Sequence, residues 1–384
     1  MKATYFEKGR FHMFENYQIP KELIPSDPRF GSGPSLIPVE FLDALRATGD
    51  QLLGTSHRKP AVKNLVKEVQ DGLRKYFQIP DDFSIVVGNG GATFLFDSIA
   101  LGLVEKKSAH FTCGEFSSKW FKAHDKVPWL EADNIAVEFG QGIKPEDRSD
   151  ADMICCTLNE TSTGVIVDSF PEVDDKTILA VDATSGGGQV PCDVSKVDLF
   201  FFGPQKVFAS EGGLYIAIMS PKARERALRL AEDKSRYIPD IMSWKTAIEN
   251  SDKNQTYNTP SITTFFFLNE QVKLMNKVGY KGVQEEGQRR ANLLYGWAEE
   301  KDYLKPFIGE ANYRSSAVAT IDVDDKVDVG ALLKKLEGEK AVYNIDAYRK
   351  LGRNQFRIAM FYNIKYEDLE KLTKLLSHAI ESAL

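Results

Sequence analysis

Six short apolar segments alternate with helical patterns through the middle of this chain. Residues between the segments form amphipathic or apolar helical patterns, for example 91–104 and a stretch that begins near Glu115. Short apolar β segments separated by helices are typical of a mostly parallel sheet wrapped by helices. We therefore expect an α/β fold whose large domain is built on such a sheet, with strands at 83–88, 108–112, 151–157, 177–182, 197–202 and 214–219.

The pattern changes after about residue 265. A long helix is expected to pass through Arg289, and the final helix has apolar residues such as Leu369, Leu372 and Leu376 at i, i+3 and i+4 spacing. Two further strands are expected between these helices, at 317–323 and 355–361, with another helix between them. This combination predicts a smaller C-terminal α/β domain.

The expected domain division follows from these two patterns. Residues 31–270 form the large domain and residues 271–384 form the small one. Residues 1–30 are expected to be an N-terminal segment that packs against the small domain or a dimer partner.

Composition restricts the possible partners and location. The 384 residues carry a formal net charge of −6, which argues against non-specific binding to nucleic acid. No apolar run approaches the ~20 residues of a membrane-spanning helix, and the polar N-terminus has no signal-peptide core. The four cysteines and five histidines show no metal-ligand spacing. We expect a cytoplasmic protein with no metal, membrane or nucleic-acid partner.

One lysine and one aspartate stand where chemistry is expected. Lys206 lies in FFGPQKVFASEGG, directly after the strand at 197–202, and Asp182 ends the strand at 177–182. A lysine sequestered among apolar residues can lose its proton and attack a carbonyl. A nearby carboxylate can keep a pyridine nitrogen protonated, so the pair indicates a pyridoxal phosphate (PLP) site. Taken singly, the lysine reads as a solvated charge and the aspartate as a turn or cap residue.

The sequence GNGGAT at 88–93 separates a strand from a helix. Backbone amides in such a turn, together with a helix N-terminus, can bind phosphate. No Gly-Lys-Ser/Thr follows, so the turn is not a P-loop. Thr93 stands where the dinucleotide fingerprint has its third glycine. A structural tight turn is the alternative, but together with Lys206 and Asp182 the turn suits a single phosphate.

Eight segments in unbroken order cover nearly the whole chain and carry a family resemblance. They are RFGSGPSLIP (29–38), LGTSHR (53–58), GNGGAT (88–93), NETSTG (159–164), VDATSGGG (181–188), FFGPQK (201–206), NQTYNTPSI (254–262) and YRKLGRNQFRIAMF (348–361). Together they resemble phosphoserine aminotransferases, which are fold-type-I PLP enzymes of the class V aminotransferase group, and most of all the branch found in mycobacteria and their relatives. The resemblance implies a seven-stranded, mostly parallel sheet in the large domain and a homodimer with shared active sites.

The resemblance implies a set of cofactor contacts. Lys206 bonds covalently to PLP, and Asp182 pairs with its pyridine nitrogen. Thr161 lies near the ring hydroxyl, and Phe116 stacks on the ring where many relatives have tryptophan; Trp120 is the weaker candidate for stacking. The expected phosphate contacts are Gly91, Ala92 and Gln205 of the same subunit and Asn258 and Thr259 of the other subunit.

The resemblance also implies the substrate contacts. A substrate with a carboxylate and a phosphate needs a local cationic cluster in this acidic protein. Arg357 is expected to bind the α-carboxylate, and Ser32 is expected near it, although a structural turn is the alternative for Ser32. The phosphate is expected to contact His57 and Arg58 of the partner subunit and either Arg349 or Arg353; the spacing does not decide between the two arginines.

The reaction implied is amino transfer from L-glutamate to 3-phosphohydroxypyruvate, which yields O-phospho-L-serine in serine biosynthesis. A phosphorylated hydroxythreonine of pyridoxine biosynthesis is a possible further substrate. Three alternatives stay open at this point. They are another class V enzyme, such as an alanine- or serine-glyoxylate aminotransferase or a cysteine desulfurase, a nicotinamide oxidoreductase, and a non-catalytic binding protein.

Overall fold

The computed structural model describes residues 13–384. Seven strands form the main sheet in the order β1-β9-β8-β7-β4-β2-β3. Only β9 runs antiparallel to its neighbours, β1 and β8, so the sheet is mostly parallel, as predicted. The strands are β1 (Ser84–Gly90), β2 (Lys107–Thr112), β3 (Glu131–Ala136), β4 (Met153–Thr157), β7 (Ile178–Asp182), β8 (Leu199–Phe202) and β9 (Gly213–Met219).

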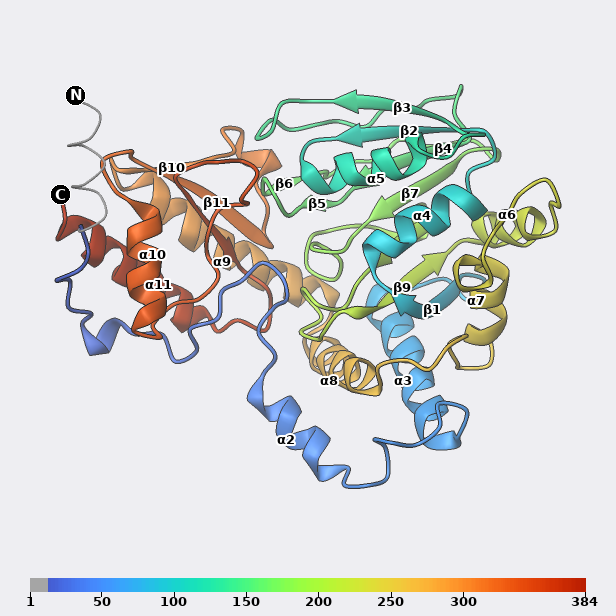
Figure 1. Cartoon of the computed structure of the whole chain (residues 1–384), viewed down its shortest axis with the longest axis horizontal. Coiled ribbons are helices and arrows are strands. Elements are labelled where there is room, and N and C mark those ends of the chain that lie inside the picture. The colour runs from blue at the N-terminus through green and yellow to red at the C-terminus, as the bar shows by residue number, and fades with distance from the viewer. Residues whose placement is uncertain (1–12) are drawn as a thin grey trace.

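Helices cover both faces of this sheet (Figure 1). Residues that alternate along one strand enter two different cores, as Phe200 and Phe201 of β8 do. Such double burial explains why the parallel strands read as continuous apolar runs. Helices α4 (Ala92–Gly102), α5 (Glu115–Asp125), α6 (Pro221–Ala231) and α7 (Trp244–Ser251) pack on the core that contains Phe201, and α3 (Pro60–Phe77) and α8 (Ile262–Val278) pack on the other.

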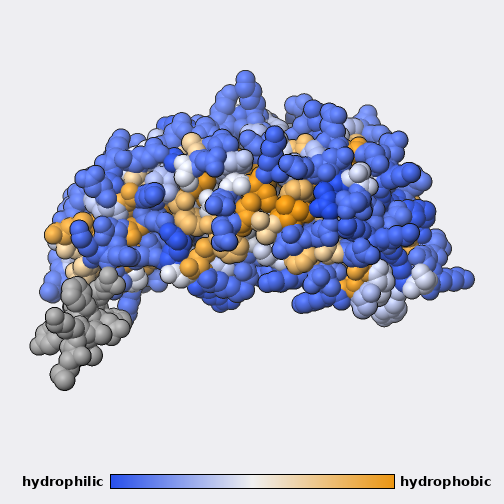
Figure 2. All heavy atoms as spheres, turned by 90° about the horizontal axis from the view of Figure 1, so that it is seen from above, coloured by the Kyte–Doolittle hydropathy of each residue, from blue (hydrophilic) through white to orange (hydrophobic). Residues whose placement is uncertain are grey.

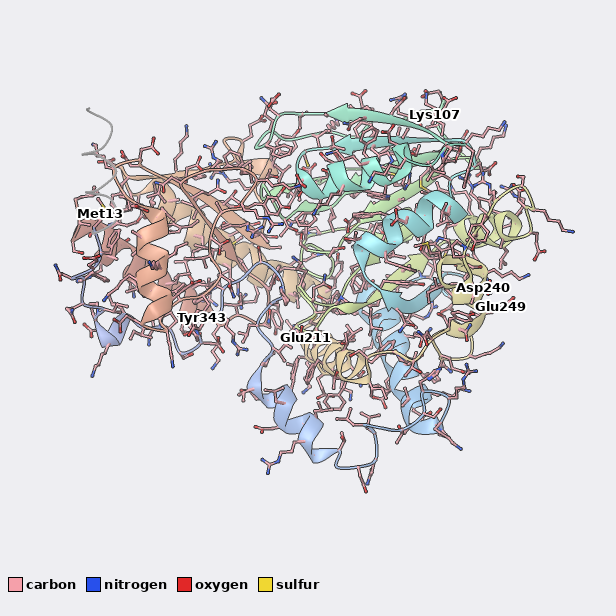
Figure 3. All side chains as sticks on the ribbon, viewed as in Figure 1. Met13, Lys107, Glu211, Asp240, Glu249 and Tyr343 are labelled. Atoms are coloured by element: carbon pink, nitrogen blue, oxygen red, sulfur yellow. The ribbon has the colours of Figure 1, made fainter. Side chains whose placement is uncertain are left out.

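The small domain is built on an antiparallel sheet of three strands, in the order β10-β11-β12. Figure 3 labels Tyr343 in this domain and Lys107 and Asp240 at the far end of the large one. The small domain consists of α9 (Tyr280–Glu299), β10 (Leu304–Pro306), β11 (Val318–Val323), α10 (Val329–Gly338), β12 (Gln355–Ala359) and α11 (Tyr366–Glu381).

The N-terminal part of the described chain packs on the small domain. The backbone amide and hydroxyl of Ser26 both donate to Asp368 of α11, at 2.6 and 2.8 Å. Phe30 is fully buried, and its amide donates to the carbonyl of Tyr343. Residues 1–12 of the predicted N-terminal segment lie outside the described residues.

The remaining elements are short or peripheral. Helix α2 (Val39–Ala47) extends away from the large domain at the bottom of Figure 1. A two-stranded hairpin pairs β5 (Asn159–Glu160) with β6 (Val165–Ile166). The 3₁₀ helices are η1 (Lys21–Leu23), η2 (Val194–Lys196), η3 (Asp240–Met242) and η4 (Ala311–Tyr313).

The sequence analysis located six of the seven strands and missed β3. That strand has the sequence EADNIA, is largely half-buried or exposed, and pairs only with β2 at the edge of the sheet. It therefore lacks the apolar run that marked the others. The short β10 and helices α2 and α3 were not identified either, whereas the two predicted small-domain strands correspond to β11 and β12.

The surface is mostly polar. Figure 2 shows one face on which hydrophilic side chains dominate and apolar residues gather in a band near the middle. Among the described residues, no helix combines the length and apolar character needed to cross a lipid bilayer.

A buried polar network joins α5 to β2. The indole N–H of Trp120 donates to Nε2 of His124 at 2.9 Å, so Nδ1 of His124 carries the proton and faces Oγ of Ser108 at 3.0 Å. The same hydroxyl lies 3.0 Å from Nε2 of His110. Both histidines are held neutral, because burial lowers the pKa of His124 to about 3 and that of His110 well below its ordinary value.

We predict that this network makes the fold sensitive to acid. The unfolded chain takes up protons at the two histidines near pH 6.5, whereas the folded chain does not. The free energy of unfolding should therefore fall as pH drops below 6.5, by roughly 1 kcal/mol per pH unit for each histidine. His124→Asn should lower stability at pH 7.5 but flatten this dependence, measured by urea unfolding at pH 7.5, 6.0 and 5.0. An equal slope in both proteins would contradict the assignment.

Candidate active site

The carboxyl ends of three strands meet at one edge of the main sheet. Asp182 is the last residue of β7, Lys206 follows β8, and Gly91 follows β1. Strands that run in the same direction end at the same edge of a sheet, which is where ligands bind in α/β folds. They line a cavity of about 380 Å³ with Gly90, Ala92, Thr93, Phe94, Phe96, Phe116, Thr157, Asn159, Thr161, Thr184, Ser185 and Gln205.

The amine of Lys206 is held close to the backbone of the N-terminal segment. Its Nζ donates to the carbonyl oxygen of Ser32 at 2.5 Å. Gly33 allows this approach, because a Cβ there would lie 1.9 Å from Nζ, and its φ of +143° also favours glycine. Burial and then the positive charge of Arg357 lower the pKa of Lys206 to about 8. A sizeable fraction of the amine is therefore neutral just above neutral pH.

The carboxylate of Asp182 is buried, with 3% of the residue exposed. Thr184 donates to it from its amide at 2.9 Å and from its hydroxyl at 2.5 Å. Burial raises the pKa of Asp182 to about 6, against the lowering effect of Thr184. No ion pair to this carboxylate forms within residues 13–384, so a cationic atom of a ligand would complete its surroundings.

Several polar atoms around the cavity have no partner within the described structure. Thr157 Oγ1, Asn159 Oδ1 and Gln205 Oε1 are buried without a hydrogen bond. Thr161, by contrast, donates from its hydroxyl to Ser185 at 2.8 Å. Buried polar atoms are nearly always paired in folded proteins, so the three free atoms indicate that the cavity holds a polar ligand.

The two aromatic residues predicted as stacking candidates lie in different surroundings. Phe116 lines the cavity at the first turn of α5. Trp120 lies one turn later, is 1% exposed, and uses its indole N–H on His124. Trp120 therefore belongs to the core. The ring of Phe116 also meets the edge of Tyr348 from the small domain, with centroids 5.8 Å apart.

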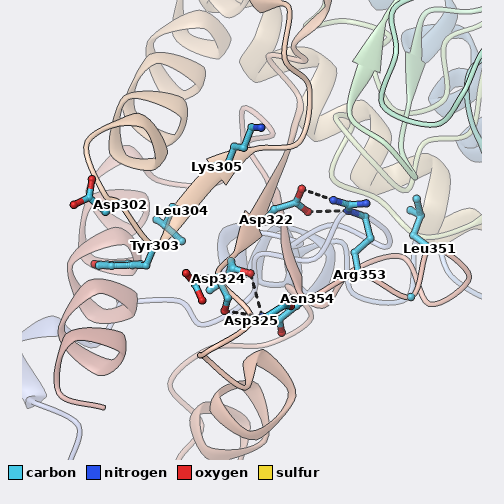
Figure 4. Close-up of a pocket in the computed structure, with 12 residues that line it drawn as sticks. Asp302, Tyr303, Leu304, Lys305, Asp322, Asp324, Asp325, Leu351, Arg353 and Asn354 are labelled. Carbon is cyan, nitrogen blue, oxygen red and sulfur yellow. Dashed lines mark hydrogen bonds and ion pairs between the residues drawn. The ribbon is translucent and has the colours of Figure 1, made fainter. Parts of the chain in front are cut away.

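The three predicted arginines have different surroundings. Arg357 is half-buried on β12, its Nε has no partner, and its guanidinium lies 5.5 Å from the ring centre of Tyr348. Arg353 instead pairs with both carboxylate oxygens of Asp322, at 2.9 and 2.6 Å, in a surface cavity of the small domain (Figure 4). Arg349 is exposed, and no hydrogen bond or ion pair engages it within the described part of the chain.

The other predicted phosphate ligands lie together, outside the cavity. Nδ1 of His57 lies 3.3 Å from the hydroxyl of Thr259, whose carbonyl accepts from Asn89 at 3.0 Å. Arg58 and Asn258 are exposed beside them. None of these four predicted residues lines the cavity of the same chain. The single chain thus forms two groups of predicted residues, one around Lys206 and one around His57.

Sequence reasoning missed some residues that line the cavity. Thr157 ends β4 and Asn159 lies two residues later; β4 is a parallel strand adjacent to β7, so their position at a strand end was the available signal. Thr184 and Ser185 also line the cavity and lie two and three residues after Asp182. Tyr348 does not line the cavity but contacts Phe116, and no sequence signal marked it, because this contact exists only through the packing of the two domains.

Comparisons with known proteins agree with this geometry. The family described as aminotransferase class-V matches residues 30–345. The chain is 42% identical to a phosphoserine aminotransferase from Corynebacterium glutamicum, over 94% of this chain and 97% of the relative. It is 43% identical to one from a Nocardioides species, over 96% of this chain and 100% of the relative.

Solved structures support the same fold. A phosphoserine aminotransferase from Cytophaga hutchinsonii superimposes with a TM-score of 0.83 and 25% identity, over 92% of this chain and 99% of that one. A PLP-bound phosphoserine aminotransferase from Trichomonas vaginalis gives a TM-score of 0.79 at 20% identity, over 91% and 99%.

The residues present fit pyridoxal phosphate, the cofactor of this family. Lys206 offers an amine whose pKa is lowered to about 8, and Asp182 offers a buried carboxylate that forms no ion pair within the described residues. The turn at Gly91 leads into the N-terminus of α4, where backbone amides favour a phosphate. The match over residues 30–345 and the identity of 42–43% place the chain in one family. It belongs to the class-V aminotransferases.

Proposed function

We propose that the protein is a phosphoserine aminotransferase. It would transfer the amino group of L-glutamate to 3-phosphohydroxypyruvate, giving O-phospho-L-serine and 2-oxoglutarate in serine biosynthesis. The observation that carries this proposal is the 42–43% identity to phosphoserine aminotransferases across 94–96% of the chain. The cavity that unites Lys206 with Asp182 supports it.

Two residues are assigned to the chemistry. When bound, PLP supplies an electron sink for negative charge that develops on the substrate Cα. Lys206 is the proposed general base and acid, because an amine with a pKa of about 8 can accept a proton from Cα and return it near neutral pH. Asp182 supplies fixed negative charge in a site shielded from water, where such charge acts strongly.

The proposed cofactor contacts follow the walls of the cavity. Phe116 would stack on the ring and Thr161 would lie near its hydroxyl, since both line the space beside Asp182. Gly91, Ala92 and Gln205 would bind the phosphate. The free Oε1 of Gln205 requires a donor, which a protonated phosphate oxygen or a water molecule would provide.

Charge complementarity supports the proposed substrate. Arg357 is half-buried with a free Nε, so its guanidinium is available to a carboxylate as a bidentate fork. Ser32 is buried next to Lys206 and is proposed to lie near that carboxylate. Of the two arginines that the sequence left open, we assign Arg349 to the substrate phosphate, because Arg353 is already paired with Asp322. The γ-carboxylate of glutamate would use the same cationic group as the phosphate.

A homodimer would complete the site. His57 and Thr259 are in contact, Arg58 and Asn258 lie beside them, and all four lie outside the cavity of their own chain. The surface around them includes large exposed apolar residues, Leu53 at 41% and Tyr257 at 44%. We propose that this group enters the active site of a second copy, with His57 and Arg58 at the substrate phosphate and Asn258 and Thr259 at the cofactor phosphate.

Three further proposals concern location, domains and a second substrate. We propose a cytoplasmic location, and a domain division into 31–270 and 271–384 with residues 1–30 as a separate segment. We also propose activity on a phosphorylated hydroxythreonine, which has a carboxylate and a phosphate as O-phospho-L-serine does. The change from a seven-stranded to a three-stranded sheet along the chain supports the division.

The fold alone does not select the substrate. An alanine–glyoxylate aminotransferase from a Nostoc species superimposes with a TM-score of 0.78 at 20% identity, over 95% of this chain and 98% of that one. A cysteine desulfurase is disfavoured on chemical grounds. Burial raises the pKa of Cys113, Cys155 and Cys156 and brings that of Cys192 to about 12, so none of the four is a ready thiolate.

A coupled assay tests the proposed function. The purified enzyme with PLP should convert 3-phosphohydroxypyruvate and L-glutamate to O-phospho-L-serine, with a kcat/KM at least about 100-fold above that for glyoxylate with alanine, as expected when a charged group of the substrate is specifically bound. Lys206→Ala should lose more than about 1,000-fold in kcat while the circular dichroism of the fold stays unchanged. Preference for glyoxylate, or near-normal turnover of Lys206→Ala, would reject the proposal.

Measurements of KM can show whether Arg349 or Arg353 contacts the substrate phosphate. Arg349→Ala should raise KM for 3-phosphohydroxypyruvate by about 10- to 100-fold, the loss expected for one charge-assisted hydrogen bond. Arg353→Ala should change it less than about threefold, because it removes an exposed pair with Asp322. Hydroxypyruvate, which lacks the phosphate, is the control and should respond little to either change. A larger effect of Arg353→Ala would reverse the assignment.

Mixed dimers test whether the site is shared. Lys206→Ala and Arg58→Ala subunits should each be poorly active alone. If Arg58 acts in the partner's site, each heterodimer has one site with both changes and one intact site, so it regains about half of the normal activity. A random mixture, in which half of the dimers are mixed, should regain about a quarter. If no activity returns after verified subunit exchange, Arg58 serves its own chain.

A further inference from the structure

Glu160 is a buried acid to which the proposed reaction assigns no role. Glu160 is the last residue of β5 and is 0% exposed. Its carboxylate accepts hydrogen bonds from the amide of Phe116 at 3.1 Å and from the amide and hydroxyl of Ser117, both at 2.9 Å. Ser162 donates from its amide at 3.2 Å and its hydroxyl at 2.7 Å. No ion pair involves Glu160 in the chain from residue 13 onward, and the hydrogen-bond donors named here are all neutral groups.

The two main-chain donors lie in the first turn of α5. The first amides of a helix lack partners within the helix, and its N-terminus favours negative charge. Glu160 thus acts as an N-terminal cap supplied from another element. Gly114, which precedes the helix, permits this, because a Cβ there would lie 2.3 Å from Cγ of Glu160. A close approach of this kind requires glycine, so the chain is built around the carboxylate.

Glu160 connects two parts of the cavity lining. The helix turn that it binds carries Phe116, which lines the cavity. Its neighbours in sequence, Asn159 and Thr161, line the cavity as well. The hydrogen bonds of one carboxylate therefore join the turn that carries the aromatic ring to the segment that carries these polar side chains.

We propose that Glu160 is a positioning residue that holds the Phe116 ring in place for the cofactor. It would act through the first turn of α5 and not by touching the cofactor. The inference rests on the proposed function in one respect, namely that pyridoxal phosphate occupies this cavity. The proposal predicts that Glu160→Gln makes the Phe116 ring less firmly held. The glutamine side chain would place its N–H groups against backbone N–H groups that now donate hydrogen bonds to the carboxylate.

A double-mutant cycle on cofactor affinity tests this role. The dissociation constant for PLP is measured by fluorescence titration of the apoprotein for the wild type, Glu160→Gln, Phe116→Ala and the double variant. Glu160→Gln should weaken binding about 10-fold or more, since it disrupts a buried, charge-assisted network. In the Phe116→Ala background the same change should cost no more than about twofold, because its target ring is gone. Additive losses would overturn the proposal.

Two further measurements separate positioning from general stability. The visible circular dichroism of the bound cofactor, scaled to the amount bound, should change in Glu160→Gln and be partly restored in Glu160→Asp, which keeps the charge. A purely structural role would lower Tm and leave this signal unchanged, which would also overturn the proposal. A matched change distant from the cavity is Ser220→Ala, which removes the hydroxyl that caps the start of α6 by accepting from the amide of Ala223; it should leave the signal intact.

A milder variant covers the case in which Glu160→Gln does not fold. Ser162→Ala removes the 2.7 Å hydroxyl donor and retains the carboxylate. It should weaken PLP binding a few-fold, less than Glu160→Gln does, because the carboxylate keeps its hydrogen bonds from Phe116 and Ser117, and this loss should vanish in the Phe116→Ala background. If the loss persists there, the proposal fails. Failure of the wild-type protein to bind PLP at all would instead reject the proposed function.

Discussion

The active site depends on the parallel pairing of β7 with β8. The two strands pair in register at Asp182 and Phe201, so Asp182 and the loop that carries Lys206 emerge at the same edge of the sheet. Both strands are fully buried, and the edge that they share is therefore enclosed by apolar layers on either side. This enclosure gives the lysine and the aspartate their unusual protonation, which residues of the same type on an open surface would not have.

Burial shifts the pKa values of Lys206 and Asp182 in directions that suit a ligand bound by both residues. It lowers the pKa of Lys206 to about 8 and raises that of Asp182 to about 6, so each is less firmly charged than in water. A cationic ligand atom beside Asp182 would restore its full negative charge, and a carbonyl would react with the neutral amine. Binding of the cofactor would therefore offset part of the free energy that burial of Lys206 and Asp182 costs the protein.

Ion pairs with nearby carboxylates distinguish the cationic residues of this segment from one another. Arg349, Arg353 and Arg357 lie within nine residues, but Asp322 on β11 engages Arg353. Lys350 pairs with Glu115 of α5, which brings the loop that carries Arg349 to the first turn of that helix. The same turn is capped by Glu160. Acidic residues in the large and small domains therefore decide which positive charges stay available to an anionic substrate.

The sequence by itself determined the α/β class and the positions of most strands, and it singled out Lys206 and Asp182 as candidate site residues, because continuous apolar runs and the residues that end them are local signals. It did not reveal β3, a polar edge strand, or the difference between Arg349 and Arg353. It also did not reveal Glu160, whose role depends on amides 43 and 44 residues away. These features were decided by the tertiary structure, since hydrogen bonds and ion pairs between distant segments depend on packing that no local pattern encodes.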